Sequence, residues 1–476
     1  MSDEYDLIII GGGAGAFSAA IKANELGAKT LMVNKGLSLG GTCVNVGCVP
    51  SKTLLWAGEV MHLAKEHHIP GLDIEVKGFD FAKVIQHELD LVVKLRAEKY
   101  EKVLNNLENV NHIEGRATFI SPNEIEVNPS TSSGQVGQRF KAKKFIIAAG
   151  STAMVPPIED IQDVEYITHI EALQLKQQPK ELIVVGAGPL GLEFAQMYAR
   201  FGTKVAILQR NVSIFPPAER ELTNRLAEIL TKEGIIIKTD IQVKSARKEG
   251  SKKILTYMIG DKQEQVQADE ILLATGKTPN TKRLALDKAG VEIDEKQAIK
   301  VSPQFQTSQP HIYAVGDVIN LSIRQEPTAG REGTLAVDNA LNNTQNSIDY
   351  NTVPWTIFTD PQLAGVGLTE EQEVKQLGRC LCRTVSFADV PKAIIMNRTE
   401  GLIKMVIHPE TKVILGVHIL APNAGELIAQ AIWLIKNKNT IDDVVTSLPM
   451  FPTLSESIKI AALSFTKDIS KLSCCI

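Results

Sequence analysis

The stretch YDLIIIGGGAGA at residues 5–16 decides the fold of this chain. Its apolar start is typical of a buried strand, and the glycines at 11–13 predict a tight turn before a helical pattern that reaches Leu26. A strand, a glycine turn and a helix build the unit that binds a dinucleotide with its phosphates at the helix N-terminus. We therefore expect Gly11 and Gly13 to line a nucleotide site.

A second copy of this pattern, LIVVGAGPLG, lies at residues 182–191. The strand after each helix ends at the same distance from the first glycine, at Asn34 in one copy and at Gln209 in the other. Two copies in equal register predict two nucleotide sites, the second lined by the glycines of its turn. Two such sites are typical of enzymes that pass hydride between a nicotinamide and a flavin. The glycines expected at the second site are Gly186, Gly188 and Gly191.

The length of 476 residues is too great for one hydrophobic core. Strand-like stretches at 271–274 and 312–315 follow the second glycine turn, and after Asp349 alternating strands surround a helical pattern at 425–436. We predict an α/β fold with two Rossmann-like dinucleotide-binding domains and an α+β C-terminal domain. The predicted domains are 1–150 (first nucleotide domain, first part), 151–272 (second nucleotide domain), 273–348 (first nucleotide domain, second part) and 349–476 (C-terminal domain).

Composition excludes several classes of protein. A net charge of -4 gives no field for collecting nucleic acid, and no apolar run approaches the roughly 18 residues that span a bilayer. The acidic start MSDEYD runs directly into a strand, which is unlike a signal peptide. Six cysteines are too few for a disulfide framework in a chain of this length. We expect a cytoplasmic protein without stable membrane association.

Two cysteines lie in the motif GGTCVNVGCVPSK at residues 40–52. Cys43 and Cys48 precede a helix expected from about Val49 to Glu66, whose N-terminus should lower the thiol pKa and favour the thiolate. Lys52 adds a cation that can neutralise charge at a reduced flavin. Two inert, buried cysteines are the alternative, and the neighbouring nucleotide fingerprint makes that alternative weaker.

The cysteine motif, both glycine fingerprints, ATGKTPN at 274–280 and YAVGD at 313–317 closely resemble the flavin-dependent pyridine nucleotide-disulfide oxidoreductases, over the whole chain. The resemblance implies FAD on the first fingerprint, NAD(P)H on the second and a homodimer formed through the C-terminal domain. It also implies that Glu193 lies beside Lys52. The remaining residues that it places near the cofactors are Ala16, Gly36, Thr42, Lys52, Ala117, Gly150, Gly276, Gly316 and Asp317.

The chain departs from the family pattern at both nucleotide sites. Asn34 stands where an acidic residue usually holds the adenosine ribose of FAD, and its amide can still hydrogen-bond a hydroxyl. Gln209 replaces the acid that favours NADH, and Arg210 follows it. A guanidinium without a neighbouring carboxylate suits a 2′-phosphate, so we favour NADPH over NADH. A solvated strand-end cation is the alternative reading of Arg210.

A third departure concerns the acid–base group. Disulfide reductases of this family carry His-Pro-Thr-x-x-Glu near the C-terminus, whereas this chain reads FPTLSE at residues 451–456. Phe451 cannot move a proton, so exchange with an organic disulfide loses a contribution of roughly 10²–10⁴-fold. A soft metal ion needs less protonation and prefers thiolate ligands.

The C-terminal sequence LSCC at 472–475 resembles the tail of the family members that reduce Hg(II). This resemblance implies that Cys474 and Cys475 collect Hg(II) from solution or small thiols and pass it to Cys43 and Cys48 of the other subunit. It implies that electrons from NADPH then pass through FAD to the cysteine pair and reduce the bound Hg(II) to elemental mercury. Tyr100 lies in a segment that resembles the source of an active-site tyrosine there. The same relatives generally have a second tyrosine at the position of Phe451, so the metal step is expected to differ here.

Two other functions stay open. One is a thiol-disulfide reductase resembling thioredoxin reductase or dihydrolipoamide dehydrogenase. The other is a flavoprotein that only sequesters thiophilic metal through its tail. A further pair, Cys380 and Cys382, would share one face of a strand and can bind a metal, but we favour a packing role as small hydrophobic residues.

Overall fold

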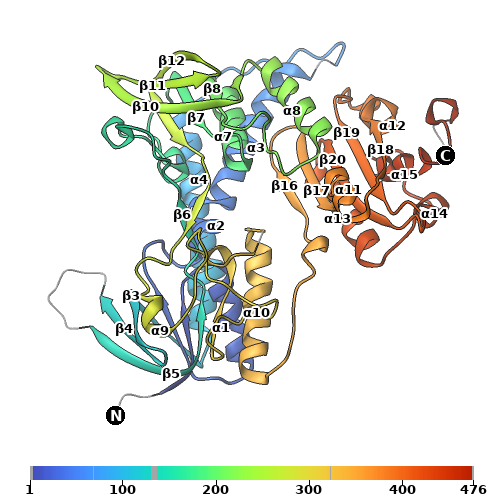
Figure 1. Cartoon of the computed structure of the whole chain (residues 1–476). Coiled ribbons are helices and arrows are strands. Elements are labelled where there is room, and N and C mark those ends of the chain that lie inside the picture. Colours follow the sequence, from blue (N-terminus) through green and yellow to red (C-terminus); the bar gives the residue numbers. More distant parts are fainter. Residues whose placement is uncertain (1–3, 68, 130–136, 322, 474–476) are drawn as a thin grey trace. The chain divides into compact units, whose positions relative to one another are not determined.

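The computed structural model describes residues 4–67, 69–129, 137–321 and 323–473 (Figure 1). The chain divides into two compact units, each assembled from three segments. The first unit comprises Met1–Ser51, Ile85–Met154 and Gly276–Asp349, and the second comprises Lys52–Val84, Val155–Thr275 and Tyr350–Ile476. Two helices run from one unit into the other, α3 (Cys48–Glu66) and α4 (Phe81–Arg96). Among the described residues, none of the helices has the length and apolar character needed to span a bilayer.

The first unit is built on a mainly parallel sheet. Strand β1 pairs in parallel with β2 and β5, β2 pairs in parallel with β3, and β15 pairs in parallel with β5. The long β3 and β5 continue past the parallel part and pair antiparallel with β4. A separate two-stranded pairing joins β6 and β14. The strands are β1 (Tyr5–Ile10), β2 (Thr30–Asn34), β3 (Val110–Ser121), β4 (Glu124–Pro129), β5 (Gln138–Ile147), β6 (Ser151–Ala153), β14 (Lys277–Pro279) and β15 (Ile312–Ala314).

Helices α1 and α10 lie side by side in this unit (Figure 1). They approach closely because both carry glycine at the contact: a Cβ on Gly333 would lie 2.2 Å from the carbonyl oxygen of Gly15. This packing fixes the start of α1, where the predicted phosphate site lies. The helices of the unit are α1 (Ala14–Glu25), α2 (Gly41–Val46), the π-helix η1 (Ala97–Glu101), α5 (Lys102–Asn105), α9 (Leu286–Ala289), the 3-10 turn η3 (Gly316–Val318) and α10 (Glu326–Asn342).

The second unit contains a second parallel sheet, in the order β13-β7-β8-β9, and an antiparallel meander of β10, β11 and β12. Its helix α7 follows β7 through the second glycine turn. The elements here are η2 (Ile161–Val164), α6 (His169–Ala172), β7 (Glu181–Val185), α7 (Pro189–Arg200), β8 (Lys204–Leu208), α8 (Arg220–Lys232), β9 (Ile236–Lys238), β10 (Ile241–Glu249), β11 (Lys252–Ile259), β12 (Lys262–Ala268) and β13 (Glu270–Leu273).

The C-terminal part of the second unit is an antiparallel sheet in the order β16-β17-β20-β19-β18, on which α13 and α15 pack. Its elements are η4 (Tyr350–Thr352), β16 (Trp355–Ile357), β17 (Gln362–Gly367), α11 (Glu370–Leu377), β18 (Leu381–Ser386), η5 (Phe387–Asp389), α12 (Pro391–Ile395), β19 (Leu402–Ile407), β20 (Ile414–Ala421), α13 (Ala424–Lys436), α14 (Ile441–Thr446), α15 (Glu456–Leu463) and η6 (Ile469–Lys471).

The predicted fold class is confirmed: two parallel sheets follow glycine turns, and an α+β region ends the chain. The expected helix at 425–436 is α13, and the expected helix at 49–66 is α3, which begins one residue earlier. The division of the chain into four domain segments stays a prediction.

Candidate active site

The loop that carries the cysteine motif rests on the first glycine turn. The backbone N–H of Gly40 donates to the carbonyl of Gly12 at 2.8 Å. A Cβ on Gly41, which has φ +62°, would lie 2.6 Å from the Cα of Gly13, so only glycine permits this approach. The contact places Cys43, in α2, next to the predicted phosphate site.

Asn45, between the two cysteines, holds this loop in shape. Its Nδ2 donates to the carbonyls of Ser38 (3.0 Å), Leu39 (3.1 Å) and Gly41 (2.8 Å), and its Oδ1 accepts from Nη1 of Arg96 at 3.2 Å. These bonds satisfy several backbone groups at once and tie the loop to α4. Neither Asn45 nor Arg96 was expected at the site from the sequence, although an amide between two cysteines was an available signal.

Cys43 is half-buried in α2, and Cys48 is the exposed first residue of α3. Their thiols are close enough to hydrogen-bond, and this bond, followed by burial, raises the pKa of Cys43 above its ordinary value. The negative charge of Glu326 acts in the same direction. The expectation of a lowered thiol pKa is therefore wrong for Cys43 in the dithiol form, because the neighbouring thiol and burial outweigh the helix N-terminus. In such a pair one thiol can ionise, but ionisation of the second is disfavoured because it would place two negative charges side by side.

Tyr100 lies beside these thiols, within the π-helical turn η1. Its ring packs edge-on against Phe17 at 4.9 Å between centroids. A Cβ on Gly40 would lie 2.9 Å from the ring, so glycine there leaves the room that the tyrosine fills. Burial first, and then the charges of Cys43 and Glu326, raise the pKa of Tyr100 to about 12. A phenol that stays protonated at neutral pH is thus held at the cysteine pair, with Glu326 as an acidic neighbour that the sequence analysis missed.

The second unit holds the pair Lys52 and Glu193. Lys52 Nζ donates to Glu193 Oε2 at 2.8 Å, and the other carboxylate oxygen accepts the backbone N–H of Phe358 at 2.9 Å. The Lys52 ammonium also lies 4.6 Å from the centre of the Phe358 ring. Glu193 is buried in α7 and is fixed at both oxygens. The arrangement matches the position that the resemblance implied for this pair.

The start of α1 fits a dinucleotide phosphate. Gly13 caps the helix without a side-chain hydrogen bond, so the first N–H groups of the helix are left for another acceptor. A Cβ on Gly11, which has φ +143°, would lie 2.2 Å from the carbonyl oxygen of Ala148. Ala16 and Ala117 are buried nearby in the same unit, in α1 and β3. Asn34 uses its Nδ2 on the carbonyl of Leu37 at 3.0 Å, which leaves its oxygen as the group for a ribose hydroxyl.

The other residues predicted near FAD lie on loops or at helix starts of the same unit. Asp317, in η3, accepts the hydroxyl of Ser151 at 2.6 Å, and Glu332 accepts the N–H of Gly316 at 2.7 Å. These bonds fix the turn that carries Asp317. The residues that occupy loop positions or helix starts here are Gly36 (φ +101°), Thr42, Gly150 (φ +67°) and Gly276 (φ +114°).

The second glycine turn repeats the same geometry. A Cβ on Gly186, with φ +108°, would lie 2.5 Å from the carbonyl oxygen of Ala274, and one on Gly191 would lie 2.0 Å from that of Gly186. Gly188 caps α7 without a side-chain bond and has open space around it. Gln209 Oε1 accepts the N–H of Ala187 at 3.2 Å, so a neutral amide binds this turn at the position where an acidic residue was expected from the family pattern. Arg210 is exposed directly after it.

The C-terminal FPTLSE segment has its own local hydrogen bonds, but its first residue, Phe451, has no acid–base group. The N–H of Thr453 donates to Oε2 of Glu456 at 3.1 Å, and the Thr453 hydroxyl donates to the carbonyl of Met450 at 2.8 Å. Phe451 is 44% exposed. Because the frame is intact, a side chain at position 451 is presented to solvent rather than buried in a core.

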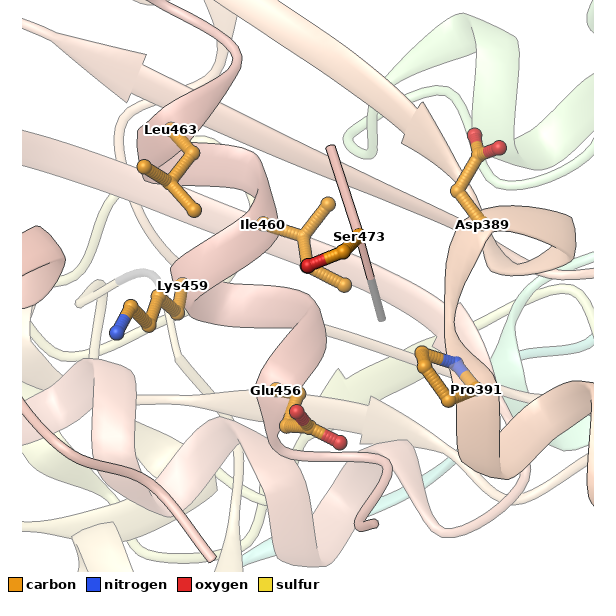
Figure 2. A pocket seen from close by; sticks show the side chains of 7 residues that line it. All are labelled: Asp389, Pro391, Glu456, Lys459, Ile460, Leu463 and Ser473. Atoms are coloured by element: carbon orange, nitrogen blue, oxygen red, sulfur yellow. The ribbon is translucent and has the colours of Figure 1, made fainter. Parts of the chain in front are cut away.

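Cys474 and Cys475 lie outside the described residues. The described tail ends at Ser473, which lines a small pocket in the second unit (Figure 2). The other residues that line this pocket are Asp389, Pro391, Glu456, Lys459, Ile460 and Leu463. The end of the described tail is thus beside helix α15, which carries Glu456 of the FPTLSE segment.

Residues 5–333 match the family model described as pyridine nucleotide-disulphide oxidoreductase, and residues 353–462 match the dimerisation domain of the same family. The chain belongs to the pyridine nucleotide-disulphide oxidoreductases. It is therefore an FAD-dependent NAD(P)H oxidoreductase with a dimerisation domain, and the two glycine turns are the parts of this oxidoreductase that fit the two nucleotides.

Relatives within the family differ in substrate. The chain is 38% identical over 473 residues to a mercuric reductase of Staphylococcus aureus, covering 99% of this chain and 84% of that protein. It is 35% identical over 469 residues to mitochondrial dihydrolipoyl dehydrogenase 1 of Arabidopsis thaliana, covering 97% and 90%. Among solved structures, the Cu(II) complex of the HOCl-induced flavoprotein disulfide reductase RclA from Escherichia coli superposes with a TM-score of 0.85 at 27% identity, covering 98% of this chain and 100% of that chain.

Proposed function

We propose that this oxidoreductase reduces Hg(II) to elemental mercury with electrons from NADPH, through FAD and the Cys43–Cys48 pair. The observation that carries the proposal is Phe451. The cysteine pair and the Thr453–Glu456 frame of a disulfide reductase are present, yet the position of the acid–base group holds a side chain without a proton to transfer. A thiophilic cation fits this site better than an organic disulfide because its release needs no protonated leaving thiol. Identity to mercuric reductases over almost the whole chain supports the same substrate.

The residues of the chain have separate tasks in this reaction. Cys43 and Cys48 would bind Hg(II) as thiolates, releasing two protons, and Cys43 would be the exchange thiol while Cys48 faces the flavin. Tyr100 would place a protonated phenol at the bound ion. FAD, when bound, supplies the two-electron relay between nicotinamide and these thiols. Lys52 would offset negative charge at the flavin, and Glu193 would hold Lys52 in position.

Cys474 and Cys475 would collect Hg(II) from small thiols and deliver it to the cysteine pair of the other subunit of a homodimer. The match to the dimerisation domain supports the two-subunit arrangement. The exposed apolar side chains of that domain, Trp433, Leu448 and Met450, are the surface we assign to subunit contact. We further propose that the protein acts in the cytoplasm, where small thiols would present the metal.

NADPH is the proposed electron donor because Gln209 is neutral and Arg210 is exposed beside the second nucleotide turn. A carboxylate at position 209 would repel a 2′-phosphate, whereas a guanidinium at 210 can pair with it. NADH is the weaker alternative.

The decisive experiment measures NADPH oxidation by the purified flavoprotein with Hg(II) in excess small thiol, beside a panel of disulfides. We expect turnover with Hg(II) and little with disulfides. Cys474→Ala with Cys475→Ala should leave flavin reduction by NADPH unchanged but slow turnover of thiol-bound Hg(II), while Ser473→Ala serves as the control. Equal turnover of disulfides and Hg(II) would reverse the substrate assignment, and an unchanged rate in the double variant would remove the tail from the pathway.

The second candidate is a thiol-disulfide reductase. The intact cysteine pair and 35% identity to dihydrolipoyl dehydrogenase favour it. Oxidation of dihydrolipoamide, or reduction of its disulfide, at a rate matching Hg(II) reduction would select this candidate. Bound metal without Hg(II)-stimulated NADPH oxidation would instead indicate sequestration alone.

A further inference from the structure

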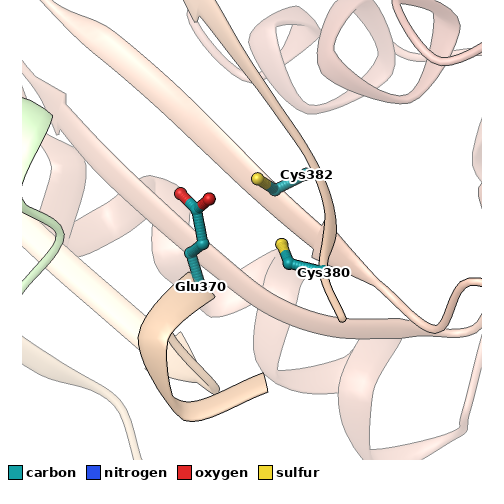
Figure 3. Close-up of side chains that lie close together, drawn as sticks. All are labelled: Glu370, Cys380 and Cys382. Atoms are coloured by element: carbon teal, nitrogen blue, oxygen red, sulfur yellow. The ribbon is translucent and has the colours of Figure 1, made fainter. Parts of the chain in front are cut away.

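A second group of thiols lies in the C-terminal part of the second unit. Cys380 and Cys382 face Glu370, and the ligand atoms of all three residues lie within 4.8 Å of one another (Figure 3). None of the three is part of the proposed reaction. From the sequence we expected these cysteines to pack as small hydrophobic residues, yet both are only half-buried, so they are not ordinary core residues.

Local structure brings these residues together. Glu370 and Glu373 lie one turn apart in α11, whose start is fixed by a capping box between Thr369 and Gln372. Gly378, with φ +74°, ends the helix and turns the chain back toward β18. Cys380 directly precedes this strand, and Cys382 is its second residue. The four side chains therefore come from a single helix–turn–strand segment.

Glu373 shows that this cluster needs a further partner. Its exposed fraction is 0%, and neither carboxylate oxygen has a hydrogen-bond partner of normal geometry among the described residues. The Cys380 thiol faces the same carboxylate. A thiol is only a weak hydrogen-bond donor, so this buried carboxylate is poorly satisfied, and native proteins normally satisfy such a group. A cation beside Glu373 and the Cys380 thiol would satisfy it.

The surrounding charge also favours a cation. Lys404 is buried and its ammonium lies 2.5 Å from Glu370, 3.1 Å from Glu219 and 3.6 Å from Glu221. Three carboxylates thus surround one ammonium, before Glu373 is included. The carboxylates outnumber the ammonium, so this region carries net negative charge. Deprotonation of the two thiols would add to that charge and is unfavourable unless a cation binds to them.

We propose that Cys380, Cys382 and Glu370 bind a thiophilic divalent cation of the Zn(II) type, with the buried carboxylate of Glu373 beside Cys380 adding negative charge to the site. Two thiolates and one carboxylate, with a fourth position for a water molecule, are a donor set suited to a borderline ion with tetrahedral preference, whereas Mg(II) and Ca(II) prefer oxygen donors alone. Binding replaces the two thiol protons, which pass to solvent, and no electrons move. The site is separate from the cysteine pair of the reaction and does not depend on Hg(II) being its substrate.

The test is equilibrium dialysis of the chelator-treated, FAD-loaded full-length protein against Zn(II), with metal counted per chain. Cys380→Ser with Cys382→Ser should bind one Zn(II) fewer per chain than the parent, with flavin content and NADPH oxidation unchanged. Glu373→Gln should weaken this site at least about tenfold, a loss of roughly 1.4 kcal/mol. The exposed neighbour Glu371→Gln is the matched control and should bind as the parent does. Mg(II) should not compete.

A measurement on the unaltered protein covers the case in which a variant does not fold. Bound Zn(II) should protect Cys380 and Cys382 from alkylation, read by mass spectrometry of their peptide, and Mg(II) should not. Equal Zn(II) binding by parent and double-cysteine variant would overturn the proposal. Alkylation of both cysteines at the same rate with and without Zn(II) would overturn it too.

Discussion

Lys52 Nζ lies 2.8 Å from Glu193 Oε2, and the same carboxylate accepts the backbone N–H of Phe358 through its other oxygen. The Glu193 side chain is 6% exposed and that of Lys52 is 34% exposed, so the pair is anchored from the carboxylate side. Such a carboxylate both positions the ammonium and offsets its charge. The position of Lys52 therefore depends on a residue far away in the sequence.

Glu193→Gln keeps the shape of the side chain and removes its charge. We expect a loss of about 1–3 kcal/mol of stability, because a charged hydrogen bond at a buried group is weakened. Flavin reduction by NADPH should also slow, because the ammonium is no longer held. Thermal unfolding and stopped-flow flavin absorbance measure the two effects. Glu371→Gln, at an exposed position, is the control; equal losses in both variants would contradict a specific role for the pair.

Tyr100→Phe tests the phenol at the cysteine pair. The ring contact with Phe17 and the fit over Gly40 survive this change, so the fold should be unaffected. We expect turnover with Hg(II) to fall by about tenfold or more, with flavin reduction by NADPH unchanged. Since the pKa of Tyr100 is raised to about 12, the parent should show no phenol ionisation in its rate profile up to about pH 10.

Tyr166→Phe, in the second unit, is the matched control for loss of a hydroxyl and should turn over Hg(II) as the parent does. If Tyr100→Phe keeps full turnover with thiol-bound Hg(II), the phenol has no part in handling the ion.

Glu88 predicts a pH-dependent stability. It is 1% exposed in α4, its Oε2 has no hydrogen-bond partner among the described residues, and burial raises its pKa to about 7 from 4.5. Between pH 4.5 and about 7, Glu88 is ionised in the unfolded chain but protonated in the folded chain, so the unfolded chain binds fewer protons. The free energy of unfolding therefore falls as pH rises through this range and levels off above about pH 7. Glu88→Gln removes this term. Its Tm should equal that of the parent near pH 4.5 and exceed it by at least about 2 °C at pH 8.

The exposed Glu108→Gln should leave Tm unchanged at both pH values. A constant Tm difference between Glu88→Gln and the parent from pH 4.5 to 8 would show that Glu88 does not titrate in this window.

Arg210→Ala tests the nucleotide preference. Removing the guanidinium should raise the KM for NADPH by about tenfold, roughly 1.4 kcal/mol, and leave the KM for NADH almost unchanged, because only NADPH carries the 2′-phosphate. Lys204→Ala removes an exposed cation from the other end of β8 and is the control. Steady-state kinetics with both nucleotides give the ratio, and an equal rise for both would assign Arg210 to general binding.

The sequence predicted the parts of the site that depend on local patterns. The glycine turns and the start of α3 follow from short motifs, because each motif fixes its own backbone. Tyr100 was indicated only by the resemblance to relatives, since its place beside the thiols is a long-range contact. The contact of Gly41 with Gly13 could not be read in this way, since it depends on how two separate turns pack.

Long-range and electrostatic features were not predictable from spacing. Glu326 reaches the thiols from α10, and Asn45 is bound by Arg96 from α4; neither contact leaves a pattern in one sequence. The pKa of Cys43 is raised rather than lowered because its neighbour is another thiol, which a helix-terminus argument leaves out. Likewise, Cys380 gains Glu373 as a neighbour only through the turn at Gly378.

Phe451→His would supply the acid–base group that the FPTLSE segment lacks. The bonds of Thr453 to Glu456 and Met450 do not involve the side chain at 451, so the frame should present the new imidazole as it presents the phenyl ring. We expect turnover of a small disulfide to rise by at least about tenfold, within the 10²–10⁴-fold range of general acid–base catalysis, while flavin reduction by NADPH stays the same. Thr411→His puts an imidazole on an exposed position in the turn between β19 and β20, away from the FPTLSE segment in the sequence, and should give no rise. Rates with Hg(II) and with the disulfide, measured for both variants, separate the outcomes. If disulfide turnover stays at the parent level in Phe451→His, the missing proton donor is not what excludes disulfides, and Phe451 loses its place as the main support for Hg(II).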